Sequence, residues 1–329
     1  MDSQDRSRRL FLHTTAATAG ALALPRYSFS QSSAALITAD SERPQALQGL
    51  QFGDPQAGSV LVWSRADRPA RMVVEWSLDE QFRKARRIIG PHALDTTDYT
   101  ARVDLAGLPQ GREVHVRVSF QGLDNSRALS APVVGSVRTL ACEGEGHHGN
   151  HRKGQNIRFQ WSGDTAGQGW GINTAFGGMK IYEAMRQREP HFFIHSGDTI
   201  YADGPIKESV TAENGQLWTN VVTPEVMKVA ETLDEYRGRY RYNLLDENVR
   251  RFNAEVPQIW QWDDHEVVNN WSDSKDLSAD ARYTEKNVPL LIAPAPAPSS
   301  TTRRCAPSMR ANHSACTASS ATARCWRFL

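Results

Sequence analysis

Apolar and polar residues alternate in several short runs between residues 59 and 140. The run at 112–120 places apolar side chains on one face, and its polar residues fall between them: Val114, Val116, Val118 and Phe120. A period of two is typical of a strand with one buried face. Similar runs lie at 59–65, 71–77, 99–105 and 133–140, separated by turn residues such as Gly107-Leu108-Pro109. Five such strands predict an antiparallel β-sandwich over residues 45–140.

From residue 157 the pattern changes, and strands alternate with helices. The segment at 177–190 has Ile181 and Met185 four residues apart and stops before Pro190, which favours a helix. The apolar runs at 157–164, 191–198 and 257–266 predict strands, and residues 223–256 predict one or two helices that start with Thr223 as N-cap and Pro224 in the first turn. Such alternation predicts right-handed crossovers and a buried, mostly parallel sheet.

All three predicted strands end in acidic residues. The first two end in Gly-Asp, at Asp164 and Asp198, and the third ends in Asp263-Asp264-His265-Glu266. Ligands gather beyond the carboxyl ends of the strands in such sheets. We therefore expect a site for two cations, with Asp198 bridging them and Asp164 on one side. Hard oxygen donors favour iron(III), calcium, manganese or magnesium over a thiolate zinc site, and Tyr201 is a candidate phenolate ligand for a ferric ion.

Composition narrows the classes of partner. The 329 residues are 40% hydrophobic, enough for two domains with cores of their own. With 38 basic and 37 acidic residues the net charge is only +1, which gives no sign of a nucleic-acid-binding surface or a polybasic membrane patch. No apolar run is long enough to cross a bilayer, so the sequence predicts no stable membrane anchor.

The N-terminus has the form of an export signal. Arg8-Arg9-Leu10-Phe11 precedes a short apolar stretch without acids, a pattern typical of a twin-arginine signal peptide, here placed at residues 1–30. The alternative is a disordered basic end. The signal predicts the twin-arginine export machinery as a partner and a periplasmic or secreted protein.

A Gly-rich and charged segment at 141–156 separates the two regions. It contains the potential metal ligands Cys142, His147, His148 and His151. No second half of a zinc-binding spacing follows nearby, so a solvated linker is favoured over a ligand cluster.

Four stretches resemble one known family. They are FGDPQAGSVLVWSR (52–65), SGDTAGQGWGIN (162–173), HSGDTIYADGP (195–205) and WQWDDHEVVNNW (260–271). Residues 48–292 are similar to the PhoD-like alkaline phosphatases/phosphodiesterases of the calcineurin-like metallophosphoesterase superfamily. The resemblance implies a fibronectin/Ig-like N-terminal sandwich followed by the first part of an α/β two-sheet metallophosphoesterase domain at 157–292. It also implies Fe(3+) and Ca(2+) and the hydrolysis of phosphate mono- or diesters by a metal-activated water or hydroxide.

The resemblance also implies roles for individual residues. Asp164, Asp198 and Tyr201 resemble metal ligands, Asp264 stands where the superfamily has a metal-binding Asn, and His265 resembles the histidine that meets the substrate phosphate; Asn269 and Asn270 are further candidates for an oxygen ligand or substrate contact. Much of the family has Cys in place of Asp164, so the metal pair is open. Trp170, in a Gly-rich loop after Asp164, is a candidate substrate contact.

Other polar and aromatic residues near the motifs have simpler interpretations. Asp203 and Glu266 are expected to accept hydrogen bonds from turn and helix-start amides rather than to bind metal. Trp260, Trp262 and Trp271 are expected to pack in the core.

The composition changes near residue 293. No acidic residue follows Glu285, and 31 of the 37 residues at 293–329 are Ala, Ser, Thr, Pro, Arg or Cys. Such a segment has no hydrophobic periodicity and cannot build a core. GC-rich codons read out of frame give these amino acids, so we expect a frameshift near residue 293, and an authentic disordered tail is the alternative. The sequence thus predicts a secreted metallophosphoesterase whose chain is incomplete; the alternative is a non-catalytic exported remnant or binding protein that keeps the sandwich.

Overall fold

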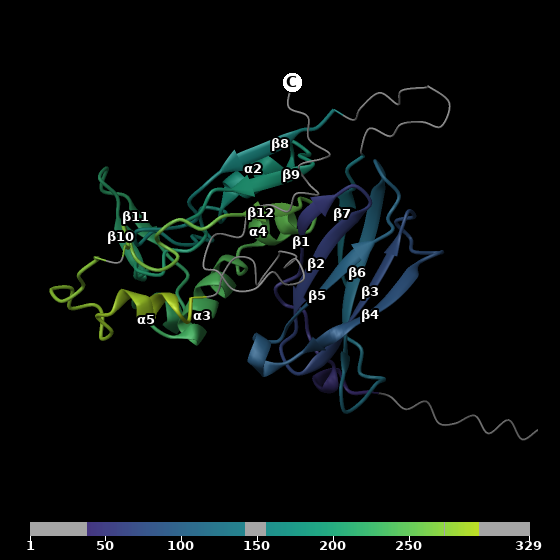
Figure 1. Cartoon of the computed structure of the whole chain (residues 1–329), viewed down its shortest axis with the longest axis horizontal. Coiled ribbons are helices and arrows are strands. Elements are labelled where there is room, and N and C mark those ends of the chain that lie inside the picture. Colours follow the sequence, from purple (N-terminus) through teal and green to yellow (C-terminus); the bar gives the residue numbers. More distant parts are fainter. Residues whose placement is uncertain (1–37, 142–155, 273, 296–329) are drawn as a thin grey trace, which may run out of the picture. The chain divides into compact units, whose positions relative to one another are not determined.

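A computed structural model of the chain describes residues 38–141, 156–272 and 274–295 (Figure 1). Its strands are β1 (Leu50–Gln56), β2 (Ser59–Arg65), β3 (Ala70–Ser77), β4 (Arg86–Ala93), β5 (Thr100–Ala106), β6 (Glu113–Gly122), β7 (Val133–Arg138), β8 (Phe159–Ser162), β9 (Phe192–His195), β10 (Ser209–Thr211), β11 (Leu217–Thr219) and β12 (Gln258–Trp260). Its α-helices are α2 (Lys180–Arg186), α3 (Leu233–Asn243), α4 (Glu247–Asn253) and α5 (Val288–Ile292). Short 3-10 helices are η1 (Asp40–Glu42), η2 (Asp95–Thr97) and η3 (Pro224–Val226). The predicted signal peptide, the histidines at 142–155 and the tail beyond residue 295 lie outside the described residues.

The N-terminal region is rich in antiparallel strands, as the alternating pattern predicts. One sheet has the order β4-β3-β6-β7. In β6 the four apolar side chains of the alternating run are completely buried: Val114, Val116, Val118 and Phe120. They join a single apolar cluster with Phe52 and Val62 from strands of the other sheet. The strands β2, β3, β5, β6 and β7 confirm the five predicted runs.

The second sheet continues into the later half of the chain. Its order is β5-β2-β1-β12-β9-β8, in which β5, β2 and β1 pair antiparallel and β12, β9 and β8 pair parallel. Strand β1 joins the two parts through a parallel pairing of Gly53 with Gln258. The sequence pattern divides the chain into a sandwich at 45–140 and an α/β region at 157–292, and it does not show that β1 forms hydrogen bonds to strands from both regions.

The three parallel strands are shorter than their predicted runs. Among the described strands, β8 has a neighbour on one side only and lies at the sheet edge, and Trp161 in it is 71% exposed. The expectation of a sheet buried throughout is therefore wrong at β8. Strand β9, between β8 and β12, is buried at Phe192 and Phe193.

The helices cover β9 on one side. Tyr182 of α2 packs edge-to-face on Phe252 of α4, and Phe252 packs in the same way on Phe193 of β9, with 5.4 Å between the ring centroids in both contacts. The predicted helical region at 223–256 divides into η3, α3 and α4. Thr223 is the N-cap of η3 and Pro224 is its first residue, whereas α3 starts at a capping box formed by Thr232 and Glu235.

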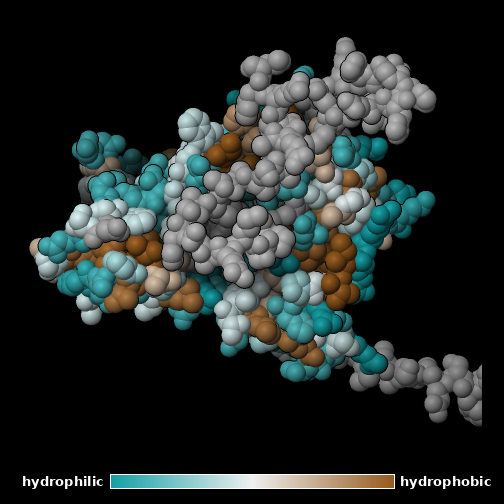
Figure 2. Space-filling view, in the orientation of Figure 1, coloured by the Kyte–Doolittle hydropathy of each residue, from teal (hydrophilic) through white to brown (hydrophobic). Residues whose placement is uncertain are grey.

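The surface is of mixed polarity. On the face in Figure 2, hydrophilic side chains divide the hydrophobic surface into separate patches. Among the described residues, no helix combines the length and the apolar character that a membrane span requires.

Candidate functional site

The three acidic loops meet at one edge of the sheet. Because β8, β9 and β12 are adjacent and parallel, the loops that follow them leave the sheet on the same side. Two backbone hydrogen bonds tie the first two loops together: the Asp164 amide donates to the Gly197 carbonyl at 3.1 Å, and the Thr165 amide donates to the Asp198 carbonyl at 2.9 Å. Asp164 and Asp198 both have left-handed backbones, with φ of 61° and 53°, a conformation that Asp tolerates better than most residues.

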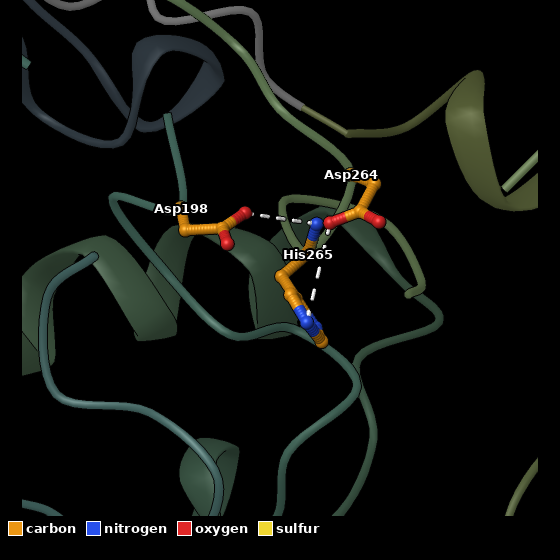
Figure 3. Close-up of side chains that lie close together, drawn as sticks. All are labelled: Asp198, Asp264 and His265. Carbon is orange, nitrogen blue, oxygen red and sulfur yellow. Dashed lines mark hydrogen bonds and ion pairs between the residues drawn. The ribbon is translucent and has the colours of Figure 1, made fainter. Parts of the chain in front are cut away.

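Asp198, Asp264 and His265 form a potential metal-binding group. One ligand atom of each lies within 4.8 Å of the others, and Figure 3 shows the two carboxylates on either side of the His265 backbone. The His265 amide donates to Asp198 Oδ1 at 3.2 Å, and its ring Nε2 lies 4.0 Å from Asp264 Oδ1. The structure thus brings together three of the five residues that the sequence analysis proposed as metal ligands or catalytic group.

The electrostatics of this group favour a cation. Asp198 is only 8% exposed. Burial, with smaller contributions from the nearby Asp263 and Asp264, raises its pKa to about 6, although its contacts with His265 act in the opposite direction. Buried carboxylates that repel one another are costly when ionised unless a positive charge lies between them. The carboxylate oxygens of Asp198 and Asp264 are donors that suit hard metal ions.

Asp164 and Tyr201 form a second pair beside the first group. The Tyr201 hydroxyl donates to Asp164 Oδ1, and burial followed by this hydrogen bond raises the Tyr201 pKa far above its ordinary value. The Tyr201 ring lies 4.3 Å from the His265 ring, so the pair is in contact with the three-residue group. Gly167 leaves room for this ring, because a Cβ there would lie 2.3 Å from it. In the absence of a cation, Tyr201 is a protonated phenol.

Asp203 orients His265, a role that the sequence analysis missed. Asp203 accepts the Asn269 amide at 2.9 Å, as its predicted structural role requires, but its other oxygen accepts a hydrogen bond from His265 Nδ1 at 2.7 Å. Burial is the largest influence on the His265 pKa and lowers it, but the hydrogen bond and charge of Asp203, together with the charges of Asp198 and Asp264, raise this pKa above its ordinary value. The sequence does contain a signal for this role: an ordinary turn requires one acidic residue, but the loop that contains Asp198 has a second one, Asp203, two residues after Tyr201.

Glu266 connects two of the acidic loops through hydrogen bonds to their backbone amides. Its carboxylate accepts the Thr199 amide at 2.6 Å and the Asp263 amide at 2.9 Å. It is 1% exposed, and burial raises its pKa to about 7 although both amides act in the opposite direction. This confirms the prediction that Glu266 satisfies backbone amides.

The weaker candidates for substrate contact lie in different places. Trp170 packs edge-to-face against Trp218, with 5.8 Å between the ring centroids, rather than against the metal-binding group. The Asn270 amide donates to Asp264 Oδ2. Asn269 lines a pocket of about 720 Å3 that also touches Tyr201 and His265. As predicted, Trp260 is buried, and Trp262 and Trp271 pack on an apolar cluster.

Comparisons with known proteins agree with this geometry. Residues 159–298 match the family described as PhoD-like phosphatase, and residues 30–141 match the PhoD-like phosphatase N-terminal domain. Alkaline phosphatase D of Bacillus subtilis (strain 168) is 27% identical over 235 residues, which are 68% of this chain and 36% of that protein. A solved structure described as the structure of PhoD has a TM-score of 0.57 at 24% identity and covers 78% of this chain and 45% of its own.

The likeness to that structure supports a β-rich N-terminal region followed by an α/β domain. The chain spans about a third of the length of the curated relative and less than half of the solved structure. The two family matches together include both groups of strands and all three acidic loops. On these matches, the chain belongs to the PhoD-like phosphatase family.

Proposed function

We propose that the protein is a metal-dependent phosphoesterase that hydrolyses phosphate mono- or diesters at the site formed by Asp198, Asp264 and His265. One observation carries the proposal. Two carboxylates and an imidazole gather at the ends of adjacent parallel strands, and burial, together with the charges of Asp263 and Asp264, raises the pKa of Asp198. Family membership gives the reaction class.

The residues present fit a cation site. Asp164, Asp198, Tyr201 and Asp264 would hold the metal ions, and we propose Fe(3+) and Ca(2+) as the pair. The tyrosine is a ligand only for a strongly Lewis-acidic ion, because its pKa is raised above the ordinary value. A carboxylate at 164 is a harder donor than a thiolate and keeps the set rich in oxygen. Such ions, when bound, make water nucleophilic at neutral pH and neutralise phosphoryl oxygens.

His265 is the group that we assign to the substrate. Its Nδ1 is occupied by Asp203, which leaves Nε2 to donate a hydrogen bond to a phosphoryl oxygen or to protonate the leaving group. The His265 pKa is raised, and a raised pKa increases the fraction of imidazolium that can carry out either role. Asn269, Asn270 and Trp170 remain weaker candidates for substrate contact.

Further parts of the proposal concern the whole chain. Residues 1–30 act as a twin-arginine signal, which directs the folded protein to the periplasm or outside the cell. The three-strand and four-strand groups of the N-terminal region support a fibronectin-like sandwich. The reading frame changes near residue 293, so the active product is a protein in which the frame continues, called here the frame-restored protein.

Substitution of His265 tests the catalytic assignment. His265→Ala in the frame-restored protein is expected to lower turnover of nitrophenyl phosphate esters about a hundredfold, the usual contribution of a positioned acid or base. Metal content, measured by plasma emission spectroscopy, should stay near that of the parent protein. His92→Ala, at an exposed position of β4, is the matched control. Equal turnover in the parent and His265→Ala proteins would assign His265 a structural role.

Substitution of Tyr201 tests the ferric ion. A ferric phenolate gives a purple to brown charge-transfer band, so the frame-restored protein should be coloured and Tyr201→Phe should be colourless. The loss should appear in the visible absorption spectrum at equal iron content. Active protein that is colourless and free of iron would contradict the assignment of both the ion and the ligand.

A further inference from the structure

The pocket beside His265 is larger than one phosphoryl group requires. Its volume of about 720 Å3 is bounded by Tyr201 and His265, by strand β10 and by residues between Lys275 and Arg282. Pockets of about 300–1,000 Å3 hold whole small molecules. The alcohol part of a phosphate ester therefore has room beside the metal-binding group.

Two lysines bring positive charge to this pocket. Lys207 and Lys275 both line it, and within the described residues no carboxylate lies within ion-pair distance of either ammonium group. Arg282 differs, because Asp280 Oδ2 lies 2.6 Å from its guanidinium. An ammonium has three donors, and the hydrogen bond from Lys275 Nζ to the Asn269 carbonyl at 2.7 Å uses one of them.

Lys275 is fixed relative to His265 by a short chain of hydrogen bonds. Asn269 accepts from Lys275 through its carbonyl and donates through its amide to Asp203. Asp203 in turn accepts from His265 Nδ1. The lysine and the imidazole thus belong to one hydrogen-bonded wall of the pocket, and this wall carries both a positive charge and the group assigned to the scissile phosphate.

The lining argues against a stacking site for a nucleobase. Tyr201 is the only phenol or indole ring among the described residues that line the pocket, and its ring already packs on His265. The exposed Trp170 packs on Trp218 instead, and neither lines the pocket. Charge, rather than stacking, is the property that the pocket offers.

We propose that Lys207 and Lys275 form a subsite for a second anionic group, a phosphate or a carboxylate, on the alcohol part of the substrate. The proposal rests on the proposed function, which places the scissile phosphate at His265. It names the substrate class: a phosphate ester that carries another negative charge within the reach of a small molecule.

The test is a calorimetric comparison of three matched ligands with the 329-residue chain at fixed low Ca(2+) and again in EDTA. They are 3-hydroxypropyl phosphate, propane-1,3-diol bisphosphate and 3-phosphonooxypropanoate. A second anion is expected to tighten binding by about fivefold for each lysine that it meets. Lys207→Gln/Lys275→Gln should remove this gain, measured as the ratio of the affinity for each dianionic ligand to the affinity for 3-hydroxypropyl phosphate, and Lys84→Gln on an exposed loop should leave the ratio unchanged.

The outcomes separate this proposal from the proposed function. Binding of 3-hydroxypropyl phosphate that depends on metal and on His265, without any gain from a second anion, overturns the subsite and leaves the phosphoesterase assignment intact. A gain that depends on the lysines but persists in EDTA and in His265→Ala supports the subsite and counts against the metal-site assignment. A gain that survives the double substitution overturns the subsite. The comparison of the bisphosphate with the carboxylate tells which second anion is preferred.

Discussion

At the scale of single residues, the site depends on how one imidazole is held. His265 has two ring nitrogens, and the nitrogen that faces the substrate is set by the partner of the other nitrogen. Asp203 occupies Nδ1 at 2.7 Å, and the amide of Asn269 holds Asp203 in turn. A residue that the sequence analysis assigned to turn amides therefore controls the tautomer and the charge of the group that we assign to catalysis.

Asp203→Asn tests this control. The side-chain amide keeps the shape of Asp203 but removes the negative charge that raises the His265 pKa, so the His265 pKa is expected to fall. Because a lower pKa leaves less imidazolium at a given pH, the pH at which half of His265 is protonated should move downward. The measurement is the titration of the His265 Cε1 proton by nuclear magnetic resonance.

The control for Asp203→Asn is Asp276→Asn, because Asp276 lies on the exposed surface and bonds only to Ser278 in the described structure. That variant should leave the His265 titration unchanged. A His265 pKa that is the same in Asp203→Asn and the parent protein would show that Asp203 acts on His265 through shape alone.

At the scale of elements, the sequence predicts strands best where one face is buried. The run that became β6 alternates cleanly because its apolar side chains enter the core and its polar ones do not. The exposed β4 and the interrupted β1 were missed. In β4 most side chains are at least partly exposed, and in β1 Asp54 adopts a left-handed backbone next to Pro55, where the register shifts.

The candidate site was predictable in part for a similar reason. Carboxylates directly after apolar strands are visible in sequence, and parallel pairing brings Asp198 and Asp264 together. The contacts of Asp203 are not visible, because they arise from the packing of loop 199–205 against loop 263–270. The pairing of β1 with β12 could not be predicted from the sequence pattern either, because it joins residues about 200 positions apart in the chain.

Glu266 links these loops, and its protonation is expected to change the stability of the metal-free protein. The folded-state pKa of about 7 lies above the ordinary value of 4.5, chiefly because of burial. Between these two pH values the folded state binds more protons than the unfolded state, so stability falls as pH rises. A shift of this size corresponds to about 3 kcal/mol across the interval.

Glu266→Gln should remove this dependence. Urea unfolding in EDTA at pH 4.5 and pH 7.5 is expected to show that the parent protein loses more stability on going to the higher pH than the variant does. The comparison with the variant is needed because His195, whose pKa burial lowers to about 4, contributes stability that rises with pH in part of the same range. Parallel pH profiles for the two proteins would show that Glu266 does not titrate in this interval.

In the molecule as a whole, the residues at which the amino-acid composition changes, near residue 293, line a large cavity. A cavity of about 550 Å3 lies between the N-terminal strands and the α/β part, and Ala293, Pro294 and Ala295 line it. Two side chains that line it, Gln51 and Trp63, each have a buried nitrogen without a hydrogen-bond partner in the described structure. Buried donors usually have partners, so this wall is expected to receive a segment with backbone carbonyls.

We expect this cavity wall to be covered by the segment that a restored reading frame encodes after residue 292. The terminal Ala-Arg-Cys-Trp-Arg-Phe-Leu can be encoded by GCG CGC TGC TGG AGG TTT TTG, and the same bases read two positions later give Ala-Leu-Leu-Glu-Val-Phe, an apolar run typical of a strand. Sequencing of the gene around codon 293 should find a missing or additional base, and the restored frame should encode a later Gly-Asp-x-His motif. The frame-restored protein should hydrolyse nitrophenyl phosphate esters when iron and calcium are supplied, whereas the 329-residue chain should show no metal-dependent turnover, because we expect the restored frame to supply further metal ligands. A gene that repeatedly gives the same codons, together with substantial turnover by the 329-residue chain, would show that the segment at 293–329 is authentic and that the site needs no later ligand.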